Sequence, residues 1–271
     1  MNVLPALATL QQLLPARTWD AHKGDFGTLL IVGGGVGMSG AALMTGMAAQ
    51  RGGAGKVMIA TDVSHAASIT QNWPSLMAYG VSDAYSLQPL LDRATHIAIG
   101  PGLGQSSWAQ GLFHTVLNTH LSLILDADAL NLLAAQPQKR KDWVLTPHLG
   151  EAARLLGCSP IEIKNDREQA IQALQKKYGG CIVLKGAHTL IHDETGLWTC
   201  HAGNPGMATA GMGDLLTGVI AALMAQGLSP LASAQLGGSV HAQAGDEAAK
   251  QGPRGMIPTD LLPFIRQFVN P

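Results

Sequence analysis

The chain has little charge, few aromatic side chains and few cysteines. Of its 271 residues 13% are charged and 4% aromatic, and the formal net charge is −1. A nearly neutral chain does not attract nucleic acid or an anionic membrane through its overall charge, so we expect neither as a partner. The three cysteines are odd in number and show no CxxC or other metal-ligand spacing, which favours free thiols in a reducing cytoplasm.

Long apolar runs are also missing. No window reaches the roughly 20 apolar residues that a membrane helix needs, and the longest candidate, residues 215–225, is expected to be a buried core helix. Residues 1–19 contain two prolines and no basic residue before Arg17, a pattern that does not fit a signal peptide. We therefore expect a cytoplasmic protein.

Glycine and aliphatic residues are abundant: the chain has 33 glycines and is 46% hydrophobic. Short apolar runs predict strands at 28–32, 56–60, 96–99, 121–125, 143–145 and 181–184. Helical patterns lie between them at 40–51, 107–119, 129–135, 150–156 and 166–178. A hairpin at 189–191 and 197–199 follows, and then helices at 214–225, 230–249 and 258–268. This alternation predicts a single α/β domain over 1–271, with a mostly parallel central sheet between two helical layers.

Glycine or polar clusters follow all six predicted strands. Because open α/β sheets bind ligands at the carboxyl ends of their strands, we expect one site there. The clusters are Gly33-Gly34-Gly35, Thr61-Asp62, Gly100-Pro101-Gly102-Leu103-Gly104, Asp126-Ala127-Asp128, Thr146-Pro147-His148 and Lys185-Gly186.

The first cluster leads into a dinucleotide-binding pattern. Residues 35–40 fit GxGxxG between a strand and a helix, and Asp62 ends the next strand. This favours an NAD-dependent oxidoreductase as one alternative, although Asp62 lies somewhat beyond the usual spacing. A GxxxxGK[ST] phosphate loop is absent from the sequence.

The segment 203–214 is the strongest candidate for binding phosphate. Gly211 and Gly213 allow a ligand to approach the backbone closely, and the helix that follows adds the positive end of its dipole. Asp214 at the helix start is expected to stay ionised and to accept a proton from a substrate hydroxyl beside the transferred phosphate. The alternative is a plain helix cap, but the glycine loop is longer than a cap requires.

Three further features lie at strand ends. The segment 185–189 carries a cation, a glycine and hydrogen-bonding groups suited to a nucleotide, or else forms an ordinary turn. His148 is a ligand contact or a structural hydrogen bonder, and Glu151 is a helix-start carboxylate or a metal-water ligand. His188, His192 and His201 suggest transition-metal ligation as a weaker alternative, because their spacing is irregular.

Together these segments resemble the ADP-dependent NAD(P)H-hydrate dehydratase family of the ribokinase-like superfamily. The resemblance spans nearly the whole chain in family order. It rests on residues 22–27, the turn through Ser39-Gly40-Ala41-Ala42, residues 100–104, 126–130, 146–151, 185–189, 203–208 and 211–214.

The resemblance implies repair of a damaged metabolite, the S epimer of hydrated NADH or NADPH. Water is eliminated to restore the dihydronicotinamide ring, and ADP is cleaved to AMP and phosphate. A small-molecule kinase of the vitamin-precursor type on the same fold remains an alternative.

The resemblance also implies roles for individual residues. Asp214 is the expected catalytic base, and Mg²⁺ is expected to be held mainly by phosphates and water, with Glu151 acting through water. The residues expected to face the hydrated dinucleotide are Ala41, Ala42, Gly102, Gly104, His148 and Asp214. Those expected to hold ADP are Lys185, Gly186, Ala187, His188, Thr189, Gly211, Met212 and Gly213.

The assembly is implied in the same way. We expect a ribokinase-like fold without a separate lid, so that a neighbouring subunit closes the site in a homo-oligomer, with a tetramer favoured. Family members are often fused to an epimerase domain, for which this sequence has no room, and we expect a separate protein to supply that activity.

Overall fold

A computed structural model describes residues 2–270 of the chain. Its ten strands are β1 (Asn2–Val3), β2 (Thr28–Val32), β3 (Lys56–Thr61), β4 (Met77–Gly80), β5 (His96–Ile99), β6 (Ser122–Leu125), β7 (Trp143–Leu145), β8 (Cys181–Leu184), β9 (Thr189–Asp193) and β10 (Gly196–Cys200). They form one sheet in the order β1-β10-β9-β8-β7-β6-β5-β2-β3-β4. Neighbouring strands are parallel except in the pairs β8–β9 and β9–β10.

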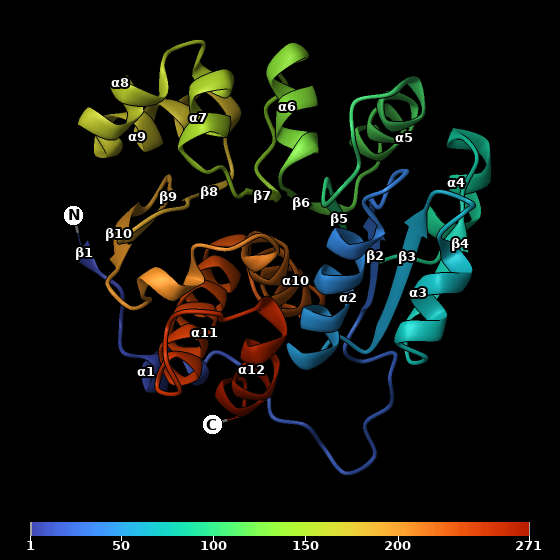
Figure 1. The fold of residues 1–271 in the computed structure, drawn as a ribbon, viewed down its shortest axis with the longest axis horizontal. Coiled ribbons are helices and arrows are strands. Elements are labelled where there is room, and N and C mark those ends of the chain that lie inside the picture. Colours follow the sequence, from blue (N-terminus) through green and yellow to red (C-terminus); the bar gives the residue numbers. More distant parts are fainter. Residues whose placement is uncertain (1, 271) are drawn as a thin grey trace.

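Helices cover both faces of this sheet (Figure 1). One face carries α4 (Ala84–Leu91), α5 (Ser107–Leu117), α6 (Asp128–Ala135), α7 (Leu149–Leu156), α8 (Pro160–Asn165) and α9 (Arg167–Tyr178). The other carries α1 (Leu7–Gln11), α2 (Ser39–Arg51), α3 (Ala66–Asn72), α10 (Met212–Ala225), α11 (Pro230–Ala249) and α12 (Leu262–Phe268). Short 3-10 turns lie at Pro205–Met207 and Pro258–Leu261. The predicted three-layer α/β arrangement is confirmed.

The central strands are apolar on both faces because both faces are covered. In β2, Leu29 and Ile31 pack toward the α2 and α10 layer, whereas Leu30 and Val32 pack toward the α4 and α5 layer. On the first of these faces α10 lies tightly against α2. A side chain on Gly218 would come within 2.2 Å of the Thr45 carbonyl oxygen, so glycine is required for this approach. The contact fixes where α10 begins, at the carboxyl edge of the sheet.

The predicted strands and helices are found with small shifts at their ends. The last predicted helix is divided into the 3-10 turn and α12, and α10 begins two residues earlier than expected. The sequence patterns missed β1, β4, α1, α3, α4 and α8. These elements are short, and several are only partly buried, so their apolar periodicity is weak.

Within residues 2–270, no helix combines the length and hydropathy needed to cross a bilayer.

Candidate active site

A buried ion pair links the ends of two central strands. Asp126 follows β6 and Lys185 follows β8, and Lys185 Nζ lies 2.6 Å from Asp126 Oδ1. The second carboxylate oxygen of Asp126 accepts a 2.8 Å hydrogen bond from the hydroxyl of Thr217 on α10. Glu151 Oε2 lies 3.8 Å from the same ammonium. These contacts join β6, β8, α7 and α10 at one point.

Asp214 lies in the first turn of α10, three residues before Thr217 and on the same side of the helix. It is not the N-cap, because the helix begins at Met212 and Gly211 occupies the cap position. The interpretation of Asp214 as an ordinary cap is therefore excluded. The hydrogen bond from Thr217 to Asp126 fixes the rotation of α10 and so directs this turn toward the buried ion pair.

The charge on Asp214 differs from the sequence-based expectation. Burial and the Asp126 carboxylate raise the pKa of Asp214 to about 7, and Lys185 opposes them only in part. The expectation that Asp214 stays fully ionised at neutral pH is therefore not met, because burial first, and then the neighbouring carboxylates, disfavour its charged form. A group with a pKa near 7 is well matched to accept and release a proton under these conditions.

Burial also acts on the neighbours of Asp214. It raises the pKa of Glu151, and the nearby Lys185 ammonium acts in the opposite direction. For Lys185, burial favours the neutral amine, but the carboxylates of Asp126 and Glu151 outweigh it and raise the pKa of Lys185 above its ordinary value. Lys185 is therefore a cation held inside an acidic cluster.

The start of α10 offers backbone N–H groups to an anion. Among the described residues no side chain caps this helix, and Gly211 at the cap position has a φ of +94°. A Cβ on Gly213 would lie 3.3 Å from Lys185 Nζ, so the second residue of the helix lies close above the buried ammonium. An uncapped helix start next to a lysine is suited to bind phosphate.

His148 and Glu151 cap α7 reciprocally. His148 Nδ1 accepts from the amides of Gly150 at 2.9 Å and Glu151 at 3.3 Å, and Glu151 Oε2 accepts from the His148 amide at 2.8 Å. Because Nδ1 accepts, the neutral ring carries its proton on Nε2, which lies 3.4 Å from Glu151 Oε1. His148 is half exposed and lies at the expected edge, where it can offer Nε2–H to a ligand.

The residues expected to face the dinucleotide lie one strand further along the edge. The Gly104 amide donates to Asp128 Oδ2 at 2.8 Å, and Gly102 packs against Ala41 at the start of α2. Ala41 is partly exposed, whereas Ala42 is fully buried beneath Gly34. The structure therefore brings Ala41, Gly102 and Gly104 together but leaves Ala42 no exposed side chain to present to a ligand.

The loop 185–189 is held from behind by Arg167. The Arg167 guanidinium donates to the carbonyl oxygens of Ala187 at 2.5 Å and Leu184 at 3.2 Å. His188 has a φ of +54°, and Ala127 beside Asp126 is the other non-glycine residue among 2–270 with a positive φ. Such strained positions gather at functional sites.

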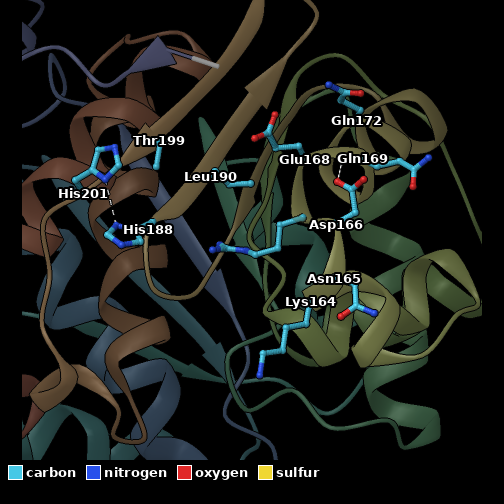
Figure 2. A pocket seen from close by; sticks show the side chains of 11 residues that line it. Lys164, Asn165, Asp166, Glu168, Gln169, Gln172, His188, Leu190, Thr199 and His201 are labelled. Atoms are coloured by element: carbon cyan, nitrogen blue, oxygen red, sulfur yellow. Dashed lines mark hydrogen bonds between the residues drawn. The ribbon is translucent and has the colours of Figure 1, made fainter.

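An open groove of about 810 Å³ runs beside this loop, between α8–α9 and the β9–β10 hairpin. Figure 2 shows His188 and His201 turned toward each other on one wall, with Lys164, Asn165 and Asp166 on the other. The Nδ1 atoms of the two histidines are 3.2 Å apart. The groove is polar and adjoins the loop expected to hold ADP.

The transition-metal interpretation of the histidines is not supported. The His192 ring hydrogen-bonds the Gly196 carbonyl oxygen within the hairpin, away from the pair formed by His188 and His201. Within residues 2–270 there is no group of three His, Cys, Asp or Glu side chains arranged to hold a metal ion.

Sequence patterns assigned no role to Asp126, Thr217 or Arg167, although the first belongs to a strand-end cluster. Asp126 could have been singled out as an acidic residue directly after an apolar strand, where burial demands a partner. Thr217 and Arg167 act through contacts with residues 91 and 20 positions away. No local spacing reveals contacts of that kind.

Comparisons with known proteins agree with this geometry. The sequence profile of the NAD(P)H-hydrate dehydratase family matches residues 29–267. The chain is 53% identical over 261 residues to the bifunctional NAD(P)H-hydrate repair enzyme Nnr of Coxiella burnetii, covering 96% of this chain and 54% of that protein. It thus spans about half the length of this bifunctional relative. It is 36% identical to the ADP-dependent (S)-NAD(P)H-hydrate dehydratase of Neisseria meningitidis, covering 99% and 94% of the two chains.

Solved structures confirm the expected ribokinase-like fold. A ribokinase-like superfamily protein of Enterococcus faecalis has a TM-score of 0.90 at 30% identity, covering 98% of this chain and 95% of that one. The ADP/ATP-dependent NAD(P)H-hydrate dehydratase of Bacillus subtilis, co-crystallised with ATP and Mg²⁺, has a TM-score of 0.87 at 28% identity, covering 98% and 97%. By fold, by sequence and by the order of its motifs, the chain belongs to the NAD(P)H-hydrate dehydratase family.

Proposed function

We propose that this protein eliminates water from the S epimer of hydrated NADH or NADPH and cleaves ADP to AMP and phosphate in the same cycle. The observation that carries the proposal is the position of Asp214, a largely buried carboxylate with a pKa near 7 in the first turn of an uncapped helix. A base beside a phosphate-binding helix start is what transfer of a phosphoryl group to a hydroxyl requires.

The chemistry needs a leaving group better than hydroxide. Asp214, in its ionised form, accepts the proton of the hydroxyl at C6 of the hydrated ring, and the oxygen attacks the β-phosphorus of ADP. The bond from that phosphorus to the bridging oxygen breaks and AMP departs. Phosphate then leaves C6 while C5 loses a proton to solvent, which restores the C5–C6 double bond. The amides at 211–213 stabilise the charge on the moving phosphoryl group.

The features around α10 support a position for the nucleotide. We assign the phosphates to the helix start and the adenosine to the groove beside residues 185–189, where Arg167 holds the loop. Lys185 contributes positive charge from below Gly213, and its own side chain stays paired with Asp126. The loop backbone and His188 are then the groups that contact ADP.

Magnesium fits this site as an ion held by phosphate oxygens and water. Both oxygens of Asp126 already accept hydrogen bonds, and Glu151 caps α7 and faces Lys185, so Glu151 would act through water. When bound, Mg²⁺ neutralises charge on the transferred phosphate.

The remaining partners are part of the same proposal. Ala41, Gly102, Gly104 and His148 face the hydrated dinucleotide, and Asp214 meets its hydroxyl. The homo-oligomer, with a tetramer favoured, and the separate epimerase that supplies the S epimer stay predictions.

Recovery of reduced nicotinamide tests the proposal directly. The protein is mixed with S-NADH hydrate, ADP and Mg²⁺, and the absorbance of the dihydronicotinamide ring is followed. We expect recovery that depends on the nucleotide. A kinase would consume the nucleotide but leave its phosphate on the second substrate, without recovery of absorbance. Failure with both ADP and ATP would contradict the proposal.

A further inference from the structure

Asp62 lies against the first glycine turn of the sheet edge. It directly follows β3, and its amide donates to the carbonyl oxygen of Gly34 at 3.3 Å. The hydroxyl of Thr61 donates to the same oxygen at 2.6 Å. On its other side, the glycine turn is hydrogen-bonded to the loop that is expected to face the dinucleotide. There the Gly35 amide donates to the Gly102 carbonyl oxygen at 2.7 Å. Asp62 therefore belongs to a continuous rim that reaches Gly102.

One oxygen of the Asp62 carboxylate is free. Oδ1 accepts from the amide of Ser64 at 3.0 Å and from its hydroxyl at 2.6 Å, and these bonds lower the pKa of Asp62. The group is partly exposed and is ionised at neutral pH. Within residues 2–270, Oδ2 accepts no hydrogen bond and no lysine or arginine pairs with this carboxylate. The neighbouring His65 ring, whose charge would also lower the pKa of Asp62, accepts at Nε2 from the Gly37 amide.

The rim lies within reach of a dinucleotide whose reacting ring is at Asp214. Asp126 follows β6 and Asp62 follows β3, and the order β6-β5-β2-β3 places the two residues three strand spacings apart, about 14 Å. On the way, Val36 is 76% exposed and Met38 40% exposed, and both offer apolar surface to a base. Dinucleotides on open α/β sheets lie across the carboxyl ends of adjacent strands in this manner.

A carboxylate at this position would discriminate between the NADH and NADPH hydrates, which differ at the 2′ position of the adenosine ribose. A carboxylate at the end of the second strand accepts a hydrogen bond from the 2′-hydroxyl of an adenosine ribose, whereas a 2′-phosphate there needs an arginine or another cation. A phosphate dianion about 5 Å from an ionised carboxylate is repelled by roughly 1.4 kcal/mol or more even at the dielectric constant of water, which corresponds to about a tenfold change in affinity.

We propose that Asp62 is a specificity-determining residue that makes this protein prefer NADH hydrate to NADPH hydrate. The inference rests on the proposed function and assigns the adenosine ribose of the dinucleotide to the rim between the glycine turn and Asp62. The glycine turn then contacts the dinucleotide as substrate and not as a redox cofactor.

Steady-state turnover of the two S-hydrates is the first test. For the wild type we expect kcat/KM to be about tenfold or more higher with NADH hydrate. Asp62→Asn keeps an oxygen for the Ser64 amide but removes the charge and replaces the free oxygen with an amide NH2. It should therefore raise kcat/KM for NADPH hydrate about tenfold and lower that for NADH hydrate, which loses the acceptor of its 2′-hydroxyl. Equal use of both hydrates by the wild type would overturn the inference, as would an equal effect of the substitution on both.

Asp193→Asn is the matched control. Asp193 Oδ1 accepts from the amide of Thr195 at 2.8 Å and from its hydroxyl at 2.7 Å, which is the same arrangement on the distant β9–β10 hairpin. This variant should leave the ratio between the two hydrates unchanged. A shift in the ratio as large as that of Asp62→Asn would contradict a local role for Asp62.

Direct binding separates this inference from the proposed function. Titration of the protein with the stable products NADH and NADPH measures discrimination without turnover. We expect NADH to bind about tenfold more tightly, and the ratio to approach one in Asp62→Asn or when salt is raised to about 0.5 M. Lack of hydrate turnover with this binding ratio intact would contradict the proposed function alone. Absence of discrimination in binding would overturn the role of Asp62.

Discussion

Asp214 differs from an exposed aspartate because burial raises its pKa and the negative charges of Asp126, Asp128 and Glu151 raise it further, whereas the Lys185 ammonium acts in the opposite direction. Lys185 is paired with Asp126, and this negative charge offsets much of the influence of the ammonium on the pKa of Asp214. Phosphates bound at the α10 start would add further negative charge, and Mg²⁺ would offset it. The pKa of Asp214 is therefore set by the whole cluster of charges and by burial, and not by a single partner.

Asp214→Asn tests the assigned base. Asparagine has nearly the same shape but cannot accept the hydroxyl proton, so we expect turnover to fall by about 10²–10⁴. The fold should persist because no hydrogen bond that positions α10 is lost, and circular dichroism checks this. Activity within a few-fold of the wild type would return Asp214 to a structural role.

The same substitution should stabilise the protein above neutral pH. Because the pKa of Asp214 is raised from 3.8 to about 7 by burial and by Asp126, the wild type loses stability as pH rises from about 4 to 7, when the buried group must ionise. At about 1.4 kcal/mol per pKa unit, the advantage of Asp214→Asn grows to at most about 4 kcal/mol by pH 8. Urea unfolding at pH 5 and pH 8 measures it. An advantage that shrinks with rising pH would contradict the raised pKa.

Lys185→Met tests the ion pair beneath the site. Removing the ammonium leaves the carboxylate of Asp126 buried without its cation, and we expect a loss of about 3–5 kcal/mol in the free energy of unfolding. The double variant Lys185→Met/Asp126→Asn removes both charges and should recover part of this loss. If Lys185→Met unfolds at the same urea concentration as the wild type, the ion pair does not stabilise the fold.

At the scale of elements, α10 depends on the backbone conformation of its N-cap residue, Gly211. Gly211 at its start has a φ of +94°, and Gly227 just past its end has a φ of +97°. A Cβ on Gly227 would meet nothing within 4 Å, whereas one on Gly211 would meet Met44 Sδ at 2.5 Å. The two positions thus share the same backbone strain but differ in location and in surroundings.

Alanine at these two glycines separates folding from binding. We expect either substitution to cost about 1–2 kcal/mol of stability from the left-handed conformation, with Gly211→Ala at the upper end. Only Gly211→Ala should weaken ADP binding, by about tenfold or more, because it shifts the amides at 212 and 213. Calorimetric titration with ADP measures this, and equal affinities in the two variants would contradict a phosphate site at the α10 start.

Sequence patterns predicted the elements that carry the site because those elements are strongly apolar and are bounded by glycine or polar clusters. The strands β2, β5, β7 and β8 begin and end where predicted. The edge strand β4 was missed, since it is only partly buried and its composition is mixed. The helix α4 was missed as well, and it contains Pro89.

The site was predicted in outline, and its electrostatics were not. Strand-end clusters locate Lys185 and His148 at one edge because parallel strands end together, whereas Asp214 was predicted from the glycine-rich segment before its helix. The raised pKa of Asp214 depends on its burial and on its distance from Asp126, which is 88 positions away in the chain, and both are set by the packing of α10 on the sheet. The capping of α7 by His148, which fixes its tautomer, likewise follows from local geometry that the sequence does not specify.

At the scale of the whole molecule, the sheet order explains how two ligands can meet at one residue. The groove beside residues 185–189 lies on the β8–β9 side of the sheet edge, and the rim formed by Gly34, Gly102 and Asp62 lies on the β2–β3 side. Asp214 lies near the junction. This order fits the proposed binding of a nucleotide and a dinucleotide end to end along the carboxyl edge, with the phosphoryl group between them.

The most direct test of this account is the product balance of one reaction mixture. S-NADH hydrate, ADP, Mg²⁺ and the protein are incubated, and NADH, AMP and phosphate are each quantified by chromatography, with Asp214→Asn as the matched control. The account predicts one AMP and one phosphate for every NADH formed, and almost none of the three with the variant. Phosphate retained on the dinucleotide, or NADH formed without consumption of ADP, would contradict it.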